Sequence, residues 1–263
     1  DKTAVSSFVI VFLHLPFMPT SSPLLPWLEP GESFPSTSAA WGEDSPAPGL
    51  LAAGGDLEPA TLLRAYSNGI FPWYSEGQPT LWWSTSPRMT LWVDEFRLHR
   101  SLKKTIRRFR DTPGSEIRVD SSFEKVIEAC SLTPRDGQNG TWILPEIRAA
   151  YLRLHHAGHA HSIETWQDGE LVGGLYCVCI GHAVFGESMF ARQTDASKLA
   201  LAALVAIARH HKVAWIDCQQ VTSHLAFMGA RPIDKKAFQQ CLDSAIPKPP
   251  IQWDFDRLYW NYL

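Results

Sequence analysis

The sequence predicts an α+β protein with a small amino-terminal α/β domain followed by a larger antiparallel-sheet domain. Short strands and amphipathic helices are mixed up to residue 139. After that point, three strands in succession, one long alanine-rich helix and a further strand indicate a single sheet with a helix packed on it. A chain of 263 residues, 45% apolar and 19% charged, is long enough to bury a core in each domain.

The predicted domains are preceded by an irregular segment rich in Pro and Ser, residues 1–48. Its apolar run at residues 8–13 is too short to span a bilayer. It also lacks a basic start and a small-residue cleavage site, which argues against a signal peptide. One interpretation is that the native protein begins at Met18 and that residues 1–17 are not native. The small domain is then 49–139 and the larger domain is 140–263.

The small domain is predicted to open with a helix that Asp56 caps and Gly69 ends, since a short polar side chain and a glycine are typical of these two positions. A second helix is expected from Ser121, where S-S-F-E has the form of a capping box. Short strands are expected at residues 80–83, 89–93 and 117–119.

The most unusual feature of the small domain is a basic segment, residues 97–110, which holds seven Lys or Arg residues and no Asp or Glu. Its apolar residues recur at helical intervals, so it is predicted to be an amphipathic helix with a cationic outer side. The cations on that side are Arg100, Lys103, Lys104, Arg107 and Arg108. Like charges one turn apart repel, and a phosphate backbone would relieve the repulsion. A solvated face and a membrane-surface helix are the alternatives.

The larger domain is predicted to begin with a helix at Pro145, a residue favoured at the first helical position. Asp168-Gly169 between two apolar segments predicts a β-hairpin, and a third strand follows it directly. A long helix is expected from Asp195, then a strand at 212–219 and a helix at 222–228.

This order of strands and helix resembles the acetyltransferase-like (GNAT-like) fold, whose members acetylate amines with acetyl-coenzyme A. Their pyrophosphate loop reads Q/R-x-x-G-x-G/A, because the glycines let backbone amides approach the phosphates at a helix start. In this chain Asp195 and Ser197 follow Arg192 at the two glycine positions. A carboxylate there would oppose the pyrophosphate, so coenzyme A is not expected, and Asp195 is interpreted as a helix cap.

Seven motifs in fixed order carry a more specific resemblance. They read GGDLEPATLLRAYSNGIFPWYSEGQPTLWWSTSPR, GTWI, GHAHSIETW, LVGGLYCV, FGESMF, ASK and IDCQ. Together they resemble the bacterial leucyl/phenylalanyl-tRNA-protein transferase family over about residues 49–232. The resemblance implies an enzyme that moves Leu, Phe or, less readily, Met from aminoacyl-tRNA to the amino-terminal Arg or Lys of an acceptor protein. The added residue is a degradation signal.

The resemblance also implies which cofactors and partners to expect. Because the aminoacyl ester is already activated, no cofactor and no metal are expected. The partners are aminoacyl-tRNA and acceptor proteins with amino-terminal Arg or Lys, without a membrane, and the family suggests a monomer. The five cysteines form no disulfide or zinc pattern, which favours a cytoplasmic location. The alternatives are a transferase that attaches residues from aminoacyl-tRNA to cell-wall precursors or other amines, and a non-catalytic RNA-binding protein.

Catalysis is assigned by the resemblance to Asp217 and Gln219 of IDCQ. The two residues alternate on a strand and are expected to face the same side. Aminolysis of an ester needs an oriented neutral amine, a proton acceptor and oxyanion donors, and a carboxylate beside an amide could serve these needs. The alternative is a structural pair at the end of a strand.

The amino-acid pocket is assigned around Glu187, which shares a strand face with Phe185 and Met189. An unpaired carboxylate among apolar residues is costly, so this position suggests function. By the resemblance, Glu187 holds the α-amino group. Met189, on the same strand face, would line the pocket, and core packing is the alternative for this residue. Leu175 and Val184 stand where relatives often have Met and an aromatic residue, so both are expected to alter the pocket's shape.

The aromatic residues of the first motif are assigned separately. Trp73, together with Trp142 of GTWI, is expected to form either the surface for the terminal adenosine of the tRNA, since bases stack on ring faces, or the edge of the amino-acid pocket. Trp82 and Trp83 point to opposite sides of a short strand, so at least one is expected to pack between the domains. The five cations of the basic helix are expected to contact tRNA phosphates.

Overall fold

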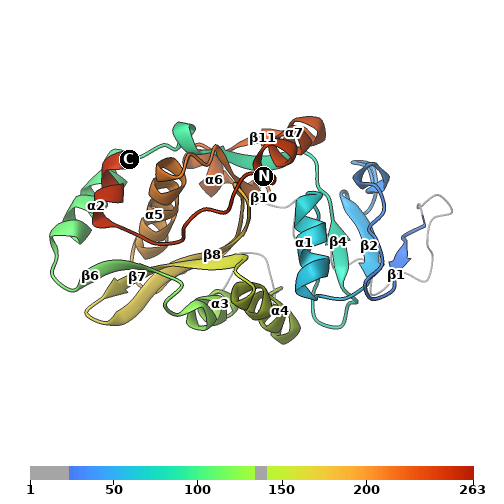
Figure 1. The fold of residues 1–263 in the computed structure, drawn as a ribbon, viewed down its shortest axis with the longest axis horizontal. Helices are drawn as coiled ribbons and strands as arrows, with labels where there is room; N and C mark the ends of the chain where they lie inside the picture. Colours follow the sequence, from blue (N-terminus) through green and yellow to red (C-terminus); the bar gives the residue numbers. More distant parts are fainter. Residues whose placement is uncertain (1–23, 134–140) are drawn as a thin grey trace.

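A computed structural model of the protein describes residues 24–133 and 141–263 (Figure 1). The interpretation of residues 1–17, and the start of the predicted larger domain at residue 140, lie outside the described residues.

The described chain is a mixed α+β protein with two sheets, as predicted. The smaller sheet has the strand order β1 (Trp27–Leu28), β2 (Leu50–Gly54), β4 (Leu81–Trp83) and β3 (Phe71–Pro72). The larger sheet has the order β11 (Arg231–Ile233), β5 (Arg88–Trp92), β10 (Trp215–Gln219), β9 (Ala183–Ala191), β8 (Glu170–Ile180), β7 (Ala160–Gln167) and β6 (Ser115–Val119).

Helices cover both faces of the larger sheet (Figure 1). The α-helices are α1 (Pro59–Ser67), α2 (Arg100–Asp111), α3 (Phe123–Leu132), α4 (Pro145–His156), α5 (Ala196–His210), α6 (Ser223–Phe227) and α7 (Lys235–Ala245). Short 3-10 helices are η2 (Thr37–Ala39), η3 (Val93–Glu95) and η4 (Arg257–Tyr262). In the figure, α5 lies on one side of β8, and α3 and α4 lie on the other.

The larger sheet takes strands from both sides of residue 140. Strands β5 and β6 precede that residue but pair with β10 and β7. The chain therefore passes from the smaller sheet to the larger sheet between Trp83 and Arg88, whereas the sequence suggested a division at residue 140. Composition could not show this, because pairing between β5 and β10 joins residues more than 100 positions apart.

Strand direction changes in the middle of the larger sheet. Strands β6 to β9 are antiparallel neighbours, β9 and β10 are parallel, and β10 is antiparallel to β5. Parallel neighbours need a crossover connection, and α5 supplies it. Its residues from Leu199 to Ala208 are all buried.

Helix α5 begins in close contact with β8 at Gly173. A Cβ atom at this position would lie 2.5 Å from the Ala196 Cβ and 2.8 Å from the Ala196 carbonyl carbon. Only glycine lets the helix start this close to the strand, so the residue fixes the crossover that places β10 beside β9.

Local signals predicted some turns correctly. Asp168 and Gly169 both have positive φ, 50° and 79°, as a type I′ hairpin turn requires. Gly69 follows α1 with φ 71°, and Pro145 is the first residue of α4, both as predicted.

The predicted side-chain caps are wrong. The α1 N-cap is Glu58, and the Asp56 carboxylate instead accepts bonds from the Glu58 and Gly31 amides. Ser122 caps α3 without a side-chain bond, because its amide and the Ser121 hydroxyl both donate to Glu164, a buried carboxylate of β7. Long-range partners displaced these local bonds.

Asp195 also fails as a side-chain cap, although it occupies the α5 N-cap position. Its φ is 64°, and its carboxylate pairs with the Lys198 ammonium at 2.8 Å instead of the backbone of α5. A residue that caps a helix with its side chain typically has β-region backbone, which Asp195 does not adopt.

The two tryptophans of β4 are both buried and pack the smaller sheet into a core that it shares with α3 and α4. Trp82 is fully buried and donates from Nε1 to the Gly54 carbonyl, 2.9 Å away. Trp83 donates from Nε1 to the Trp73 carbonyl at 2.6 Å. Both belong to a core that also contains Phe123 of α3 and Ile147 of α4, so one core serves both sheets.

We expect Gly173→Ala to destabilise the fold by about 1–3 kcal/mol, because the added methyl group must displace the backbone of α5. The measurement is the free energy of unfolding in urea. Gly42→Ala is the matched control, since no atom lies within 4 Å of a Cβ there. Equal stability of the two variants would contradict the close packing at Gly173.

Candidate active site

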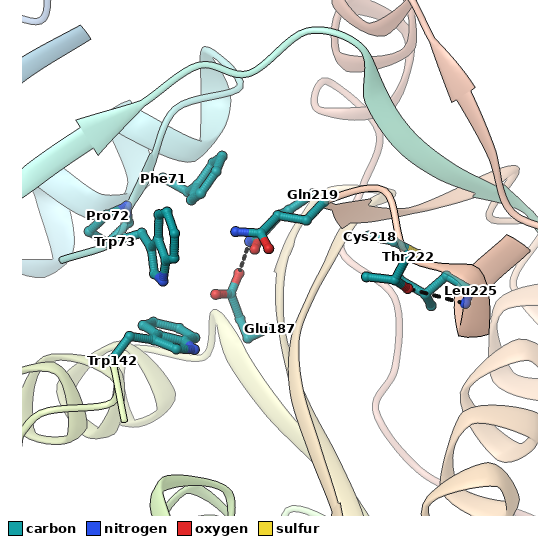
Figure 2. Close-up of a pocket in the computed structure, with 10 residues that line it drawn as sticks. Phe71, Pro72, Trp73, Trp142, Glu187, Cys218, Gln219, Thr222 and Leu225 are labelled. Atoms are coloured by element: carbon teal, nitrogen blue, oxygen red, sulfur yellow. Dashed lines mark hydrogen bonds between the residues drawn. The ribbon is translucent and has the colours of Figure 1, made fainter. Parts of the chain in front are cut away.

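The site forms where β9 and β10 are both interrupted by a bulge. In β9, Ser188 pairs with Tyr176 and Gly186 with Cys177, so Glu187 is the extra residue. In β10, Asp217 pairs with Thr90 and Gln219 with Met89, so the extra residue is Cys218. Bulges redirect side chains at sheet positions. Here they bring Glu187 and Gln219 together, as Figure 2 shows.

The Glu187 carboxylate is bound by three donors from three different elements. Its Oε1 accepts a hydrogen bond from the Tyr66 hydroxyl of α1 at 2.7 Å. The same oxygen accepts from Gln219 Nε2 of β10 at 2.9 Å. Its Oε2 accepts from the Tyr151 hydroxyl of α4 at 3.4 Å, and the two tyrosine hydroxyls also bond each other.

Burial controls the ionisation of this cluster. It raises the pKa of Glu187 to about 7, and the hydrogen bonds from Tyr66 and Gln219 oppose the rise. Burial likewise raises the pKa of both tyrosines well above its ordinary value, so the hydroxyls stay protonated donors. Near neutral pH, Glu187 is therefore close to its midpoint and responds strongly to a charged ligand.

Two cavities meet at Glu187. The aromatic cavity has a volume of about 230 Å³ and is lined by Phe71, Trp73, Trp142 and Gln219, among others (Figure 2). The apolar cavity has a volume of about 270 Å³. Its apolar walls include Leu175, Met189, Leu201, Leu204 and Ile216. Glu187 lines both cavities, so one carboxylate stands between a surface suited to a ring and a space suited to an apolar side chain.

Asp217 lies behind the aromatic cavity and lines neither space. Its side chain is fully buried and paired with Arg88, with the closest atoms, Nη2 and Oδ2, 2.7 Å apart. Its Oδ1 also accepts a hydrogen bond from the backbone amide of Gln219 at 2.8 Å. Asp217 and Gln219 were expected to face the same side, but the bulge at Cys218 breaks the alternation of the strand.

The structure separates the two positions expected to alter the pocket. Leu175 lines the apolar cavity, together with Met189. Val184 is fully buried, lines neither cavity and packs in the core that includes Ile216. The sequence placed Val184 near the pocket by its closeness to FGE, and it packs in the same core as the cavity residues Leu175 and Ile216 without lining the cavity itself.

Tyr66, Tyr151 and Arg88 are the polar residues of this region that sequence reasoning missed. The tyrosines are fully buried in two helices, and Arg88 is only 1% exposed. Tyrosines at helical spacing look like core residues, so no local signal marked them. Arg88 ends the first motif, where a charged residue after a proline resembles an ordinary surface position.

The basic helix α2 is solvated on its cationic side. Leu102, Ile106 and Phe109 are buried. The cations Arg100, Lys103, Lys104, Arg107 and Arg108 are all exposed, and within the described ranges none of them forms an ion pair with a carboxylate. The helix packs on α5 and β6, on the side of the molecule away from the smaller sheet (Figure 1).

All five cysteines are free. In the part of the chain that the structure describes, no group of three or more His, Cys, Asp or Glu residues could hold a metal ion. Among the helices of the described residues, none is long and apolar enough to cross a membrane.

A half-buried carboxyl between a ring-lined cavity and an apolar cavity suits a transferase that binds an aminoacyl group joined to a nucleoside. Comparison with known proteins agrees with this class. A family model described as "Leucyl/phenylalanyl-tRNA protein transferase" matches residues 90–243, and the model of that family's N-terminal domain matches residues 55–86. The chain belongs to this family and is an enzyme.

Curated relatives cover nearly the whole chain. The leucyl/phenylalanyl-tRNA–protein transferase of Albidiferax ferrireducens is 61% identical over 94% of this chain and 97% of its own. The corresponding proteins of Leptothrix cholodnii and Burkholderia multivorans are 60% and 56% identical, over 91% and 89% of this chain and 95% and 92% of theirs.

A solved structure, a GCN5-related N-acetyltransferase from Kribbella flavida, matches 66% of this chain and 60% of its own at 11% identity and a TM-score of 0.33. A likeness of this size does not establish a shared fold. The α+β class is confirmed by the two sheets, and the acetyltransferase-like part of the fold remains a prediction from the order of the elements.

We expect Tyr66→Phe to raise the pKa of Glu187 above about 7, because the hydrogen bond that it removes stabilises the ionised carboxylate. The measurement is a pH titration of the Glu187 carboxyl carbon by NMR. Tyr74→Phe is the matched control, since that hydroxyl donates to Glu146 and not to Glu187. An unchanged or lower pKa in Tyr66→Phe would contradict the assigned bond.

Proposed function

We propose that this enzyme transfers Leu, Phe and, less readily, Met from aminoacyl-tRNA to the amino-terminal Arg or Lys of acceptor proteins, creating a degradation signal. The observation that carries the proposal is the meeting of the aromatic and apolar cavities at Glu187, in a chain of this family. The names of the relatives supply the tRNA and the protein as substrates.

The two cavities suit the two ends of an aminoacyl-adenosine. Trp73 and Trp142 offer ring faces for the adenine, since bases stack on aromatic side chains. Leu175 and Met189 offer an apolar wall for an aliphatic or aromatic side chain that is unbranched at Cβ, and a flexible thioether adapts to both kinds. Glu187 between them binds the α-amino group, whose positive charge favours the ionised carboxylate.

The reaction is aminolysis of an ester. The neutral amine of the acceptor attacks the aminoacyl carbonyl, a C–N bond forms and the ester C–O bond breaks. The proton that the amine loses is finally taken up by the leaving ribose oxygen. Because the ester is already activated, the reaction balances without a nucleotide cofactor or metal. Gln219, at the edge of the aromatic cavity, is placed to orient the ester.

Asp217 is assigned to positioning in this proposal. A general base must reach the proton that it removes, and Asp217 is fully buried outside both cavities. The Asp217 carboxylate accepts a hydrogen bond from the backbone amide of Gln219 at 2.8 Å, so Asp217 acts on transfer through Gln219. Of the roles that the sequence left open, the burial and contacts of Asp217 therefore favour the structural pair over the proton acceptor.

The α2 cations Arg100, Lys103, Lys104, Arg107 and Arg108 are proposed to bind tRNA phosphates. They are exposed on one helix without carboxylate partners among the described residues. We also propose that the enzyme acts in the cytoplasm, which its free cysteines support, and as a monomer, as the family resemblance suggests.

The direct test mixes purified protein with charged leucyl-tRNA and a peptide that begins with Arg. Transfer of Leu to that peptide is expected, and a peptide with an acetylated amino terminus is the control. Transfer only to other amines would favour an amine-directed transferase. Binding of tRNA without any transfer would favour a non-catalytic RNA-binding protein, and either result would overturn the proposal.

We expect simultaneous replacement of Lys104, Arg107 and Arg108 by Ala to weaken tRNA binding at every sequence. The slope of log affinity against log salt should fall by roughly one for each phosphate that the variant no longer neutralises. Transfer from a minimal aminoacyl-adenosine should persist. Lys125→Ala, which removes an exposed cation of α3, is the control. If transfer from aminoacyl-adenosine fell together with tRNA binding, α2 would be a structural helix.

A further inference from the structure

Arg88 is a buried cation that the proposed reaction does not use. It lies on β5, is 1% exposed and lines neither cavity. Its guanidinium lies between the rings of Phe71 and Phe238, 4.7 Å from each centroid. Burying a charge is costly unless it is paired, so a cation held this tightly between two rings requires strong partners.

The guanidinium reaches two separate parts of the site. Its Nε donates to both carboxylate oxygens of Asp217, at 2.9 and 3.1 Å, and its Nη2 donates to Oδ2 at 2.7 Å. Its Nη1 donates to the Gly69 carbonyl at 3.1 Å. One planar side chain therefore joins β10 to the end of α1, and a rigid fork fixes both in one plane.

The Asp217 side of this contact leads to Gln219. Asp217 Oδ1 accepts the Gln219 amide at 2.8 Å, and Gln219 has φ 56°, a conformation that non-glycine residues rarely adopt. Such a backbone costs roughly 1–3 kcal/mol and persists only where its surroundings hold it. The Arg88–Asp217 pair supplies that support, and the conformation directs Gln219 Nε2 to Glu187 Oε1.

The Gly69 side of the contact leads to Tyr66. The Gly69 amide donates to the Tyr66 carbonyl at 3.0 Å, so the Gly69 turn closes the last turn of α1. Holding the Gly69 carbonyl therefore fixes the end of the helix that carries Tyr66. Tyr66 and Gln219 are the two donors to the same oxygen of Glu187.

We propose that Arg88 is a positioning residue for aminoacyl transfer, which sets both donors of Glu187 Oε1 by holding Asp217 on β10 and Gly69 at the end of α1. The expected effect of Arg88 on transfer rests on the proposed function. The restraint that Arg88 places on Gln219 does not. It also explains how a fully buried carboxylate such as Asp217 affects transfer.

The choice of variant follows from the burial of the pair. Arg88→Met alone would leave a buried unpaired carboxylate, which destabilises proteins by about 3–5 kcal/mol. The double variant Arg88→Met with Asp217→Leu removes both charges, a change that is often neutral for stability. Arg88→Lys is the second variant, because it keeps the charge but removes the fork that reaches both partners.

The experiment measures single-turnover transfer from leucyl-tRNA, tRNA affinity, and hydrogen exchange of the Gln219 amide by NMR. In the double variant we expect kcat to fall about 100-fold, as for a misplaced reacting group. The affinity for tRNA should be unchanged, and the Gln219 amide should exchange faster. In Arg88→Lys the same changes are expected at about 10-fold, since one charge-assisted hydrogen bond is worth about that much.

The control replaces an exposed pair nearby, Arg231 of β11 and Glu95 of η3, by Arg231→Met with Glu95→Leu, and should leave all three quantities unchanged. Wild-type kcat and wild-type Gln219 exchange in a folded double variant, or in Arg88→Lys if the double variant does not fold, would overturn the role of Arg88. Absence of transfer by the wild-type enzyme would overturn the proposed function instead, and exchange of the Gln219 amide would still decide whether Arg88 holds this residue.

Discussion

The site depends on one half-buried carboxyl, that of Glu187. It is held by tyrosine hydroxyls from α1 and α4 and by the side-chain amide of Gln219 from β10, so two helices and a strand of the larger sheet meet at this group. Removing a carboxylate from water is tolerated here because donors surround it, and the remaining cost appears as a pKa near 7. A group poised in this way discriminates between a charged and a neutral ligand amine, which suits the recognition of an α-amino group.

The geometry around Glu187 is created by irregularities in the strands. Each of β9 and β10 gains one extra residue, and these two residues, Glu187 and Cys218, both line the cavities. Regular strands would have placed Glu187 and Gln219 by simple alternation. The bulges instead turn both side chains into one space, while the pair of Arg88 and Asp217 behind them holds the left-handed backbone of Gln219.

Much of the fold could be predicted from sequence, because the relevant signals are local. Asp168-Gly169 specified its turn, Pro145 its helix start, and the apolar spacing of α2 its buried face. Asp195 was predicted correctly as the N-cap residue of α5, but the loss of its side-chain capping bond to Lys198 could not be predicted, nor could the bonds from Ser121 and Ser122 to Glu164. The residues of the site likewise fall into those that local motifs predicted and those that they did not. Motifs identified Glu187 and Gln219, whereas the burial of Asp217 and the roles of Tyr66 and Arg88 depend on long-range contacts and on bulges that no local pattern shows.

The central claim is that Glu187 binds the amine of an aminoacyl group whose side chain fills the apolar cavity. A crystal structure with a non-hydrolysable phenylalanyl-adenosine tests it most directly. The account predicts the phenyl ring against Leu175 and Met189, the adenine against Trp73 and Trp142, and the α-amino nitrogen within hydrogen-bonding distance of Glu187. A phenyl ring outside the apolar cavity, or an α-amino nitrogen without contact to Glu187, would contradict it.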